Sequence, residues 1–457
     1  MSDSQKTTNA LKPTRRDFLK ATAAGSMGLA AAGSLNIARS AHAAGTDVIK
    51  IALIGCGRRG LGSLQDRFKV GDNVKLVALA DVAEKPIQAA AKLLQSQDEF
   101  QEKLALDDDH LFTGFDGYKH AVESCDQVLV ASPPGFHPVH YAYAVEKGKH
   151  VFVEKPFSVD APGYKICMAA NQIAEEKKLT VCAGYQRRHQ PSYLEWIKRI
   201  QDGEIGDVRS TRVYWNGGQV WIRGVRGENE SEMSFQVRDW YFFNWLSGDN
   251  IIEQHCHNID VGNWIHGKGD RLAHPVKCYG LGGRQWRKTP ILPYNECGNV
   301  FDHHYVEFHF ADDTIMHSQC RQINGCWNSV TEKVEGTKGR GEACWLKPDN
   351  GERWDFPKKQ NKNAYVEEHV HQADAIRNGK YLHDGWHSAT SSMTAVMGRM
   401  ATYSGKEIAW DEAVEKGSAL FPYNKELTFE TEPPVMPGSD GTYEHAVAIP
   451  GIYNPFA

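Results

Sequence analysis

The chain has 457 residues, which is longer than a typical single domain and predicts two domains. Hydrophobic residues make up 41% and charged residues 24%, the composition of ordinary soluble globular enzymes. This composition excludes a disordered chain, a collagen-like fibre and a polytopic membrane protein. The formal net charge of −5 argues against a nucleic-acid partner, because proteins that bind the phosphate backbone carry an excess of basic residues.

Residues 1–43 are typical of a twin-arginine export signal. Arg15 and Arg16 precede a weakly apolar run over 21–33, and Ala41-His42-Ala43 forms a small-x-small cleavage site. The apolar run is too short and its side chains are too small to span a bilayer. We therefore expect the twin-arginine export machinery as a partner, no membrane anchor, and a periplasmic or otherwise exported mature protein.

Ten cysteines follow this signal, and none forms a Cys-x-x-Cys pair. The twin-arginine route carries proteins that have already folded in the reducing cytoplasm. We therefore expect most of the cysteines to be small buried apolar residues. If any pair forms a disulfide, Cys320 and Cys326 are the first to check, and the sequence does not decide it.

Residues 47–190 alternate between short β-rich runs and helical stretches. The expected strands are Val48–Ile54, Val74–Ala80, Val128–Ala131, His150–Val153 and Leu179–Cys182, with helices over Val139–Lys147 and Ala161–Lys178. Such alternation predicts a doubly wound parallel sheet of the Rossmann type. Residues 191–457 instead contain longer strands without helices between them, at Val208–Trp215, His304–Phe310 and Thr314–Gln319. This second part is predicted to be an α+β substrate-binding domain with a large open, mainly antiparallel sheet.

The first expected strand runs into a Gly-x-Gly-x-x-Gly turn. Gly55 permits the tight turn, Gly57 allows a pyrophosphate to approach the backbone, and Gly60 permits close helix–strand packing. Asp81 ends the second strand, where a carboxylate binds the adenosine ribose and repels a 2′-phosphate, so NAD is predicted over NADP. The remaining residues of the loop are Cys56, Arg58 and Arg59, and because either arginine could accommodate a phosphate, NADP stays an alternative.

Two further segments follow strand ends, at the edge where such sheets bind ligands. Ser132, Pro133 and His137 come after the expected strand Val128–Ala131, and Glu154 and Lys155 come after His150–Val153. A lysine held beside a nicotinamide would hydrogen-bond a substrate oxygen and stabilise a developing alkoxide.

Glu253, His257 and Asp260 form a third group in the second half of the chain. On a continuous helix they share one face, where the carboxylate could orient the histidine as a general base. Two alternatives remain: a set of solvated polar residues, or a zinc site in which Glu253, His255 and His257 are the ligands. We predict no metal. Trp240 and Tyr241 precede this group and are candidates for stacking on a sugar face.

Together these motifs resemble the glucose–fructose oxidoreductase/inositol dehydrogenase/MocA (Gfo/Idh/MocA) family. Further similarities lie in 184–188, 334–339 and 400–410. The resemblance implies a Rossmann domain followed by a domain with an open sheet, a nicotinamide cofactor, and a homodimer or homotetramer. It also implies that Lys155 and His257 take part in proton and hydride transfer. Further candidates from the resemblance are Arg188 at the cofactor, and Tyr185, His255 and Asp260 at the substrate.

Many relatives carry an aspartate where this chain has Glu253, and a glycine where it has His255, so the base is assigned to His257 with His255 as the alternative. Free NAD is scarce outside the cytoplasm, which predicts a cofactor that is loaded before export and held tightly. The function expected is oxidation of a sugar or polyol hydroxyl. The alternatives are a redox-neutral NAD-dependent glycosidase and a non-catalytic binding protein.

Overall fold

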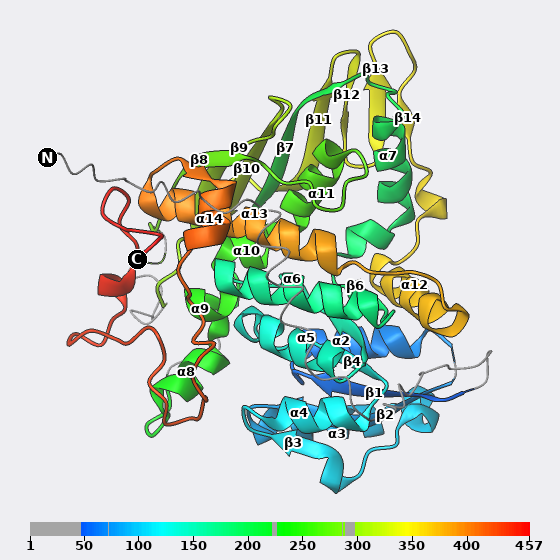
Figure 1. The fold of residues 1–457 in the computed structure, drawn as a ribbon, viewed down its shortest axis with the longest axis vertical. Coiled ribbons are helices and arrows are strands. Elements are labelled where there is room, and N and C mark those ends of the chain that lie inside the picture. The colour runs from blue at the N-terminus through cyan, green and yellow to red at the C-terminus, as the bar shows by residue number, and fades with distance from the viewer. Residues whose placement is uncertain (1–46, 72, 222–225, 286, 288–297) are drawn as a thin grey trace, which may run out of the picture. The chain divides into compact units, whose positions relative to one another are not determined.

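The computed structural model describes residues 47–457 except 72, 222–225, 286 and 288–297, so the predicted export signal lies outside the described residues. A parallel six-stranded sheet has the order β3-β2-β1-β4-β5-β6 and forms the Rossmann part (Figure 1). Its strands are β1 (Ile49–Ile54), β2 (Val74–Asp81), β3 (Leu111–Thr113), β4 (Gln127–Val130), β5 (His150–Val153) and β6 (Val181–Ala183). The doubly wound sheet is as predicted, and the short, partly exposed β3 is an addition that the sequence pattern did not indicate.

The Rossmann strands are apolar on both faces because helices cover both. Ile49, Ile51 and Leu53 enter one core cluster, while Ala52 and Ile54 enter the cluster on the opposite face. The helices of this part are α2 (Arg58–Phe68), α3 (Glu84–Gln95), α4 (Gly117–Ser124), α5 (His137–Glu146) and α6 (Ala161–Glu176). The chain connections place the ends of β1, β2, β4 and β5 at one edge, which is where the predicted cofactor residues lie.

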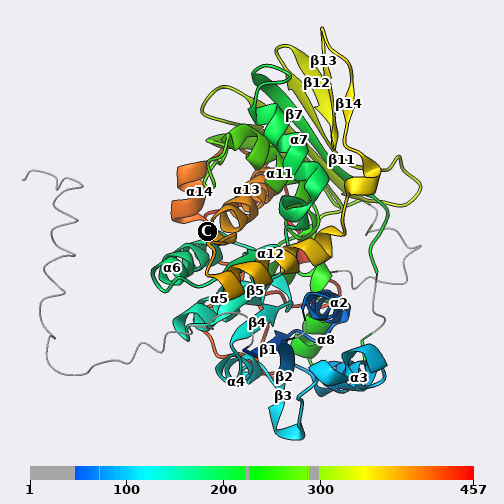
Figure 2. The same ribbon diagram turned by 90° about the vertical axis from the view of Figure 1, so that its right-hand side faces the viewer.

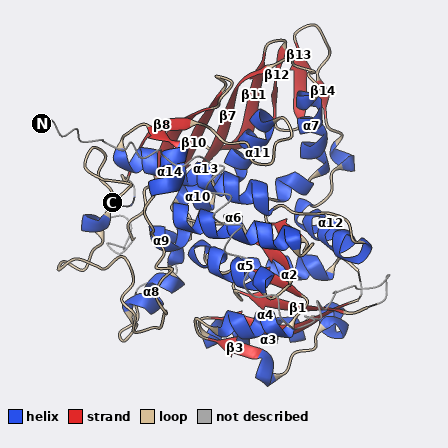
Figure 3. Cartoon of the chain, in the orientation of Figure 1, coloured by secondary structure: helices blue, strands red, loops and turns tan. Residues whose placement is uncertain are grey.

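The second sheet has nine strands in the order β14-β13-β12-β11-β7-β10-β9-β8-β15, and its pairs are antiparallel except for β7 with β10 (Figure 3). This agrees with the predicted open, mainly antiparallel sheet. Its strands are β7 (Val208–Gly217), β8 (Lys277–Gly283), β9 (His303–His309), β10 (Ile315–Gln322), β11 (Ser329–Gly336), β12 (Gly339–Glu342), β13 (Trp345–Pro348), β14 (Trp354–Asp355) and β15 (Ile408–Ala409). Burial alternates residue by residue along β9 and β10, so one face of these strands packs on helices and the other does not.

The remaining helices lie after residue 190, and some of them return to the Rossmann part. They are α7 (Pro191–Gln201), α8 (Glu232–Arg238), α9 (Asn244–Ser247), α10 (Asn250–Glu253), α11 (Cys256–Gly267), α12 (Ala364–Asn378), α13 (Gly385–Ser404) and α14 (Trp410–Lys416). Helix α12 lies against α2 (Figure 2), and Gln372 donates to Val151 O at 2.9 Å. The residues that cover the Rossmann sheet therefore do not all come from 47–190. No described helix is both long and apolar enough to cross a membrane.

Candidate cofactor and catalytic site

The turn between β1 and α2 is shaped so that only its middle glycine faces open space. Gly55 has φ +90°, and a Cβ there would lie 2.5 Å from the carbonyl carbon of Ala131. A Cβ on Gly60 would lie 2.0 Å from Gly55 O, so α2 packs directly under the turn. Gly57 is the N-cap of α2 and a Cβ there would meet nothing within 4 Å. The unpaired N–H groups at this helix start therefore face free space, as binding of a pyrophosphate requires.

Asp81 is held in a fixed orientation at the end of β2. Its carboxylate accepts hydrogen bonds from Cys56 N at 2.9 Å and Ala83 N at 3.2 Å. The Cys56 thiol points to Ala80 O at 3.5 Å, and burial together with the charge of Asp81 raises its pKa well above the usual value. Cys56 is thus a packing residue of the turn, whereas Asp81 presents its carboxylate to the neighbouring cavity.

A cavity of about 700 Å³ runs along this edge of the sheet. The predicted residues Gly55, Cys56, Gly57, Arg58, Asp81, Ser132, Pro133 and Trp240 all line it. The residues that the sequence did not indicate include Lys85, Phe115, Val237, Arg238 and Phe429. The cavity has the volume expected for a dinucleotide-sized ligand, and the helix start, the ribose-binding carboxylate and the apolar walls fit an NAD-type cofactor.

The predicted cofactor residues that do not line this cavity are Arg59, Gly60, His137, Glu154, Lys155 and Arg188. His137 lies between Pro156 O, 2.6 Å from Nδ1, and Ser132 O, 2.7 Å from Nε2, and burial lowers its pKa to about 4. It therefore joins the loop after β4 to the loop after β5. The Arg59 Nε donates to Glu154 Oε1 at 2.5 Å, and Arg59 also pairs with Glu368 of α12 at 3.3 Å. This pairing engages the Arg59 guanidinium with two carboxylates, and its predicted place beside a phosphate stays a prediction.

Lys155 pairs with Glu253 in a nearly buried contact. Its Nζ lies 3.0 Å from Glu253 Oε1 and also donates to Glu253 O. Burial by itself would lower the pKa of Lys155, but the Glu253 carboxylate outweighs it and the pKa is raised. The lysine is therefore held as a cation at the end of β5.

This contact corrects the predicted role of Glu253. The expected single helix is broken between Glu253, the last residue of α10, and Cys256, the first residue of α11. The described contacts of Glu253 place its side chain against Lys155, with no hydrogen bond to His257. The carboxylate thus orients the lysine, and the i,i+4 spacing does not create the expected carboxylate–histidine pair.

His257 is a buried, neutral imidazole with an available nitrogen. It stacks on Trp215, with ring centroids 5.8 Å apart at 20°, and meets the ring of Tyr185 edge-on at 5.9 Å. Burial, with the charges of Lys155 and Arg187, lowers its pKa well below the usual value. Among the described residues neither His257 Nδ1 nor Glu253 Oε2 has a hydrogen-bond partner, although both atoms are buried. Buried polar groups are normally satisfied, so these two atoms indicate a place where a polar ligand binds.

Three of the other predicted site residues have partners within the protein. His255 is buried with Nε2 2.8 Å from Ser318 Oγ, and burial lowers its pKa to about 3. Its Nδ1, like that of His257, has no hydrogen-bond partner among the described residues, so His255 stays the alternative base. Arg188 makes two 2.8 Å hydrogen bonds to the Asp260 carboxylate and stacks on Trp264. This pair is internal and neither residue lines the cavity, so the assignments of Arg188 to the cofactor and Asp260 to the substrate stay predictions.

The aromatic candidates separate into different environments. Trp240 lines the dinucleotide-sized cavity, whereas the Tyr241 hydroxyl bonds Gln322 and its ring is fully buried. Tyr185 is also buried, with its hydroxyl 3.2 Å from Ser392 Oγ, and supports His257 from below. Trp215 of β7, which no motif singled out, is the aromatic residue that stacks on the candidate base.

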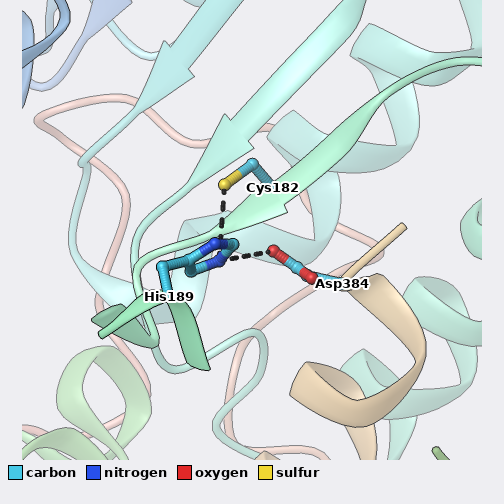
Figure 4. Close-up of side chains that lie close together, drawn as sticks. All are labelled: Cys182, His189 and Asp384. Carbon is cyan, nitrogen blue, oxygen red and sulfur yellow. Dashed lines mark hydrogen bonds and ion pairs between the residues drawn. The ribbon is translucent and has the colours of Figure 1, made fainter. Parts of the chain in front are cut away.

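The described residues hold one group with metal-ligand chemistry, Cys182, His189 and Asp384, shown in Figure 4. His189 Nε2 lies 3.1 Å from Asp384 Oδ2 and 3.9 Å from Cys182 Sγ, so the three groups bind one another. Cys182 also donates to Glu368 O at 3.4 Å, and Asp384 accepts from Ala183 N at 3.2 Å. These contacts connect β6 with the start of α13. Of the alternative zinc ligands, Glu253 pairs with Lys155, His255 contacts Ser318, and the ring of His257 stacks on Trp215.

The described cysteines are all unpaired, including the candidate pair Cys320 and Cys326. Cys320 is buried and Cys326 is exposed. Seven of the nine described cysteines are buried, as expected for small apolar residues.

The fold and the site define a dinucleotide-binding Rossmann protein with an open-sheet second part. Residues 49–185 match the family described as "Oxidoreductase family, NAD-binding Rossmann fold" (GFO_IDH_MocA). The chain is 25% identical over 346 residues to scyllo-inositol 2-dehydrogenase (NAD(+)) of Bacillus subtilis, covering 73% of this chain and 87% of that protein.

Solved structures share the fold. A scyllo-inositol dehydrogenase from Lactobacillus casei with bound NAD(H) and scyllo-inositol has a TM-score of 0.58 at 19% identity, covering 80% of this chain and 100% of that one. An aldose-aldose oxidoreductase from Caulobacter crescentus has a TM-score of 0.60 at 17% identity, covering 79% of this chain and 99% of that one. About a fifth of this chain therefore lies outside the shared fold.

Proposed function

We propose that this protein is an exported member of the Gfo/Idh/MocA family that oxidises a hydroxyl group of a sugar or polyol with a tightly held NAD. The observation that carries the proposal is the unpartnered, buried Nδ1 of His257, on an imidazole whose pKa is lowered by burial and by Lys155. The similarity to an NAD-dependent inositol dehydrogenase and the NAD-binding match of residues 49–185 support the same chemistry.

Each residue has a distinct part in the proposed reaction. The nicotinamide, when bound, supplies the hydride acceptor. His257 is neutral and accepts the proton of the substrate hydroxyl at its free ring nitrogen. Lys155 donates a hydrogen bond to the same oxygen and stabilises its developing negative charge. Glu253 keeps Lys155 charged and in place through the 3.0 Å contact.

NAD is favoured over NADP by the oriented carboxylate of Asp81, which would repel a 2′-phosphate. Arg58 and Lys85 are basic residues that also line the cavity, so the preference for NAD over NADP has to be measured. Retention of the cofactor follows from the predicted export signal, because an exported enzyme that released NAD would stop after one turnover.

The decisive experiment uses the mature protein purified after export without added cofactor. Inositols, free sugars and aryl glycosides are added in turn, while the absorbance of reduced nicotinamide and the released aglycone are followed together. The expected result is a stoichiometric rise in reduced cofactor that a second carbonyl compound discharges. Steady aglycone release without net reduction would instead establish a redox-neutral glycosidase. Absence of any bound or bindable nicotinamide would contradict both and leave a binding protein.

A further inference from the structure

The dinucleotide-sized cavity is closed by residues far away in sequence from the Rossmann fingerprint. The segment 420–443, which we name the C-terminal strap, follows α14 and contributes Phe429 to the cavity wall. Helix α8 contributes Val237 and Arg238, and Trp240 follows directly after it. Three separate stretches of the chain thus surround the same space.

The strap is fastened to the Rossmann part before it reaches the cavity. Asp160, the fully buried N-cap of α6, accepts hydrogen bonds from Leu420 N at 2.7 Å and Phe421 N at 3.0 Å. Its other oxygen accepts from the Tyr423 hydroxyl at 2.9 Å. The Phe421 ring packs edge-on against Phe136 at 5.0 Å. This anchor fixes the direction in which the strap leaves the Rossmann part.

A second anchor fastens the strap beyond the cavity. Gln236 of α8 donates to Val435 O, and the Tyr443 hydroxyl lies 2.5 Å from Glu232 Oε1 and 2.8 Å from Arg226. The Tyr443 ring is buried and meets Phe243 edge-on at 5.0 Å. The strap therefore has one end on the Rossmann part and the other on α8, with Phe429 between the two anchors.

Phe429 lies at the Asp81 end of the cavity. Asp81 pairs with Thr113 across β2 and β3, and Phe115 follows two residues later. The rings of Phe115 and Phe429 are 5.3 Å apart at 63°. In a Rossmann fold this is the end that receives the adenosine of the dinucleotide. The two rings offer apolar and aromatic surface to a planar base.

We propose that the C-terminal strap is a cofactor-retaining element, in which Phe429 covers the adenosine end of NAD and the two anchors keep it closed. The proposal rests on the proposed function, because it requires a nicotinamide dinucleotide in this cavity. For the dinucleotide to leave, either the strap or α8 has to move and its anchoring hydrogen bonds have to break. Slow release of the cofactor follows from the fold of the chain itself.

The test measures release of NADH from the full mature protein, by the loss of nicotinamide fluorescence when excess NAD is added. Phe429→Ala is expected to accelerate release about tenfold, since stacking of a base on an aromatic ring contributes about 1–3 kcal/mol. Met436→Ala is the matched control, because Met436 is a large strap residue that is 38% exposed and does not line the cavity. It is expected to release NADH at the wild-type rate.

Tyr443→Phe tests whether the anchors of the strap, and not only the contact of Phe429 with the cofactor, slow the release of NADH. It removes the hydroxyl bonds to Glu232 and Arg226 at the far anchor and keeps the ring, so it is expected to accelerate release several-fold without touching the cofactor. Thermal unfolding of each variant establishes that it is folded. If wild type binds NADH and both Phe429→Ala and Tyr443→Phe release it at the wild-type rate, the strap is overturned while the proposed function stands. If wild type binds no NADH, both proposals fail together.

Discussion

Lys155 shows how a single contact decides the protonation state of a candidate catalytic group. A fully buried lysine normally loses its charge, since burial penalises the cation. Here the Glu253 carboxylate, 3.0 Å from Nζ, reverses that effect and raises the pKa. The same positive charge contributes to the lowered pKa of His257. The two residues are therefore held in opposite protonation states, one as a hydrogen-bond donor and the other as a proton acceptor.

Replacing Glu253 by Gln tests this division of roles through the pH profile of kcat/KM. In the wild type the alkaline limb comes from deprotonation of Lys155, whose pKa the Glu253 carboxylate raises above the usual value for lysine. Without the Glu253 carboxylate the largest effect that raises the pKa of Lys155 is lost while burial still lowers it, so the alkaline limb is expected to move to lower pH. The acid limb comes from protonation of His257 and is expected to stay well below pH 6.5.

Glu253→Asp is the control, because it retains the charge and is expected to restore part of the alkaline limb. A profile in which Glu253→Gln moves only the acid limb would contradict the contact seen here. That outcome would return Glu253 to the predicted role beside His257.

At the scale of the element, two glycines of the β1–α2 turn are required for different reasons. Gly60 is required by close packing, whereas Gly57 leaves room for a pyrophosphate. Gly57→Ala adds a methyl group to open space on the protein side but in the path of a pyrophosphate. It is expected to weaken NAD binding by at least about tenfold, which corresponds to about 1.4 kcal/mol, with the melting temperature unchanged. Gly60→Ala places its methyl group 2.0 Å from Gly55 O and is expected to destabilise the fold as well.

Calorimetric titration with NAD and thermal unfolding of the two variants check this pair of expectations. Equal NAD affinity in Gly57→Ala and the wild type would show that no phosphate approaches this helix start. Equal melting temperatures for Gly60→Ala and the wild type would show that the close packing of α2 under the turn does not constrain the fold.

The elements also show which parts of the site the sequence could predict. The glycine turn, Asp81 and Lys155 follow strands directly, so a local pattern fixes their place at the sheet edge. Glu253 and His257 were placed on one helix face because periodicity cannot detect the break between α10 and α11. The pairing of Arg188 with Asp260 is equally invisible, since those residues are far apart in sequence. Phe429 has no motif around it, and only the path of the C-terminal strap brings it to the cavity.

At the scale of the whole molecule, the second half of the chain completes the Rossmann part. Helix α12 places Glu368 against Arg59 and His369 against Ser63, with His369 Nε2 3.2 Å from the serine hydroxyl. The strap closes the other side, over the cofactor cavity. The predicted boundary at residue 190 divides the sequence, but segments from beyond it pack on the Rossmann part. Cofactor binding and global stability are therefore expected to be linked, because the same segments support both.

Four histidines make the stability of the whole molecule sensitive to acid. Burial lowers the pKa of His137 to about 4, and those of His140, His255 and His266 to about 3. Below the unfolded value of about 6.5 the unfolded chain binds protons that the folded chain excludes. The free energy of unfolding is therefore expected to fall as pH decreases from about 6.5 towards 4, by up to about 1.4 kcal/mol per pH unit for each histidine.

Urea unfolding at a series of pH values measures this slope, and His266→Gln provides the matched variant. His266 contacts two threonine hydroxyls, Thr211 at 3.0 Å and Thr314 at 2.8 Å, which a neutral amide can also bind. In the variant, unfolding is expected to take up one proton fewer, so the unfolding free energy changes with pH by about 1.4 kcal/mol per pH unit less than in the wild type. The variant is expected to remain folded at pH 7. A wild-type stability that stays constant between pH 6.5 and 4.5 would mean that these buried histidines accept protons without unfolding. In that case the lowered pKa of His257, which rests on the same burial, would have to be reconsidered for the catalytic base as well.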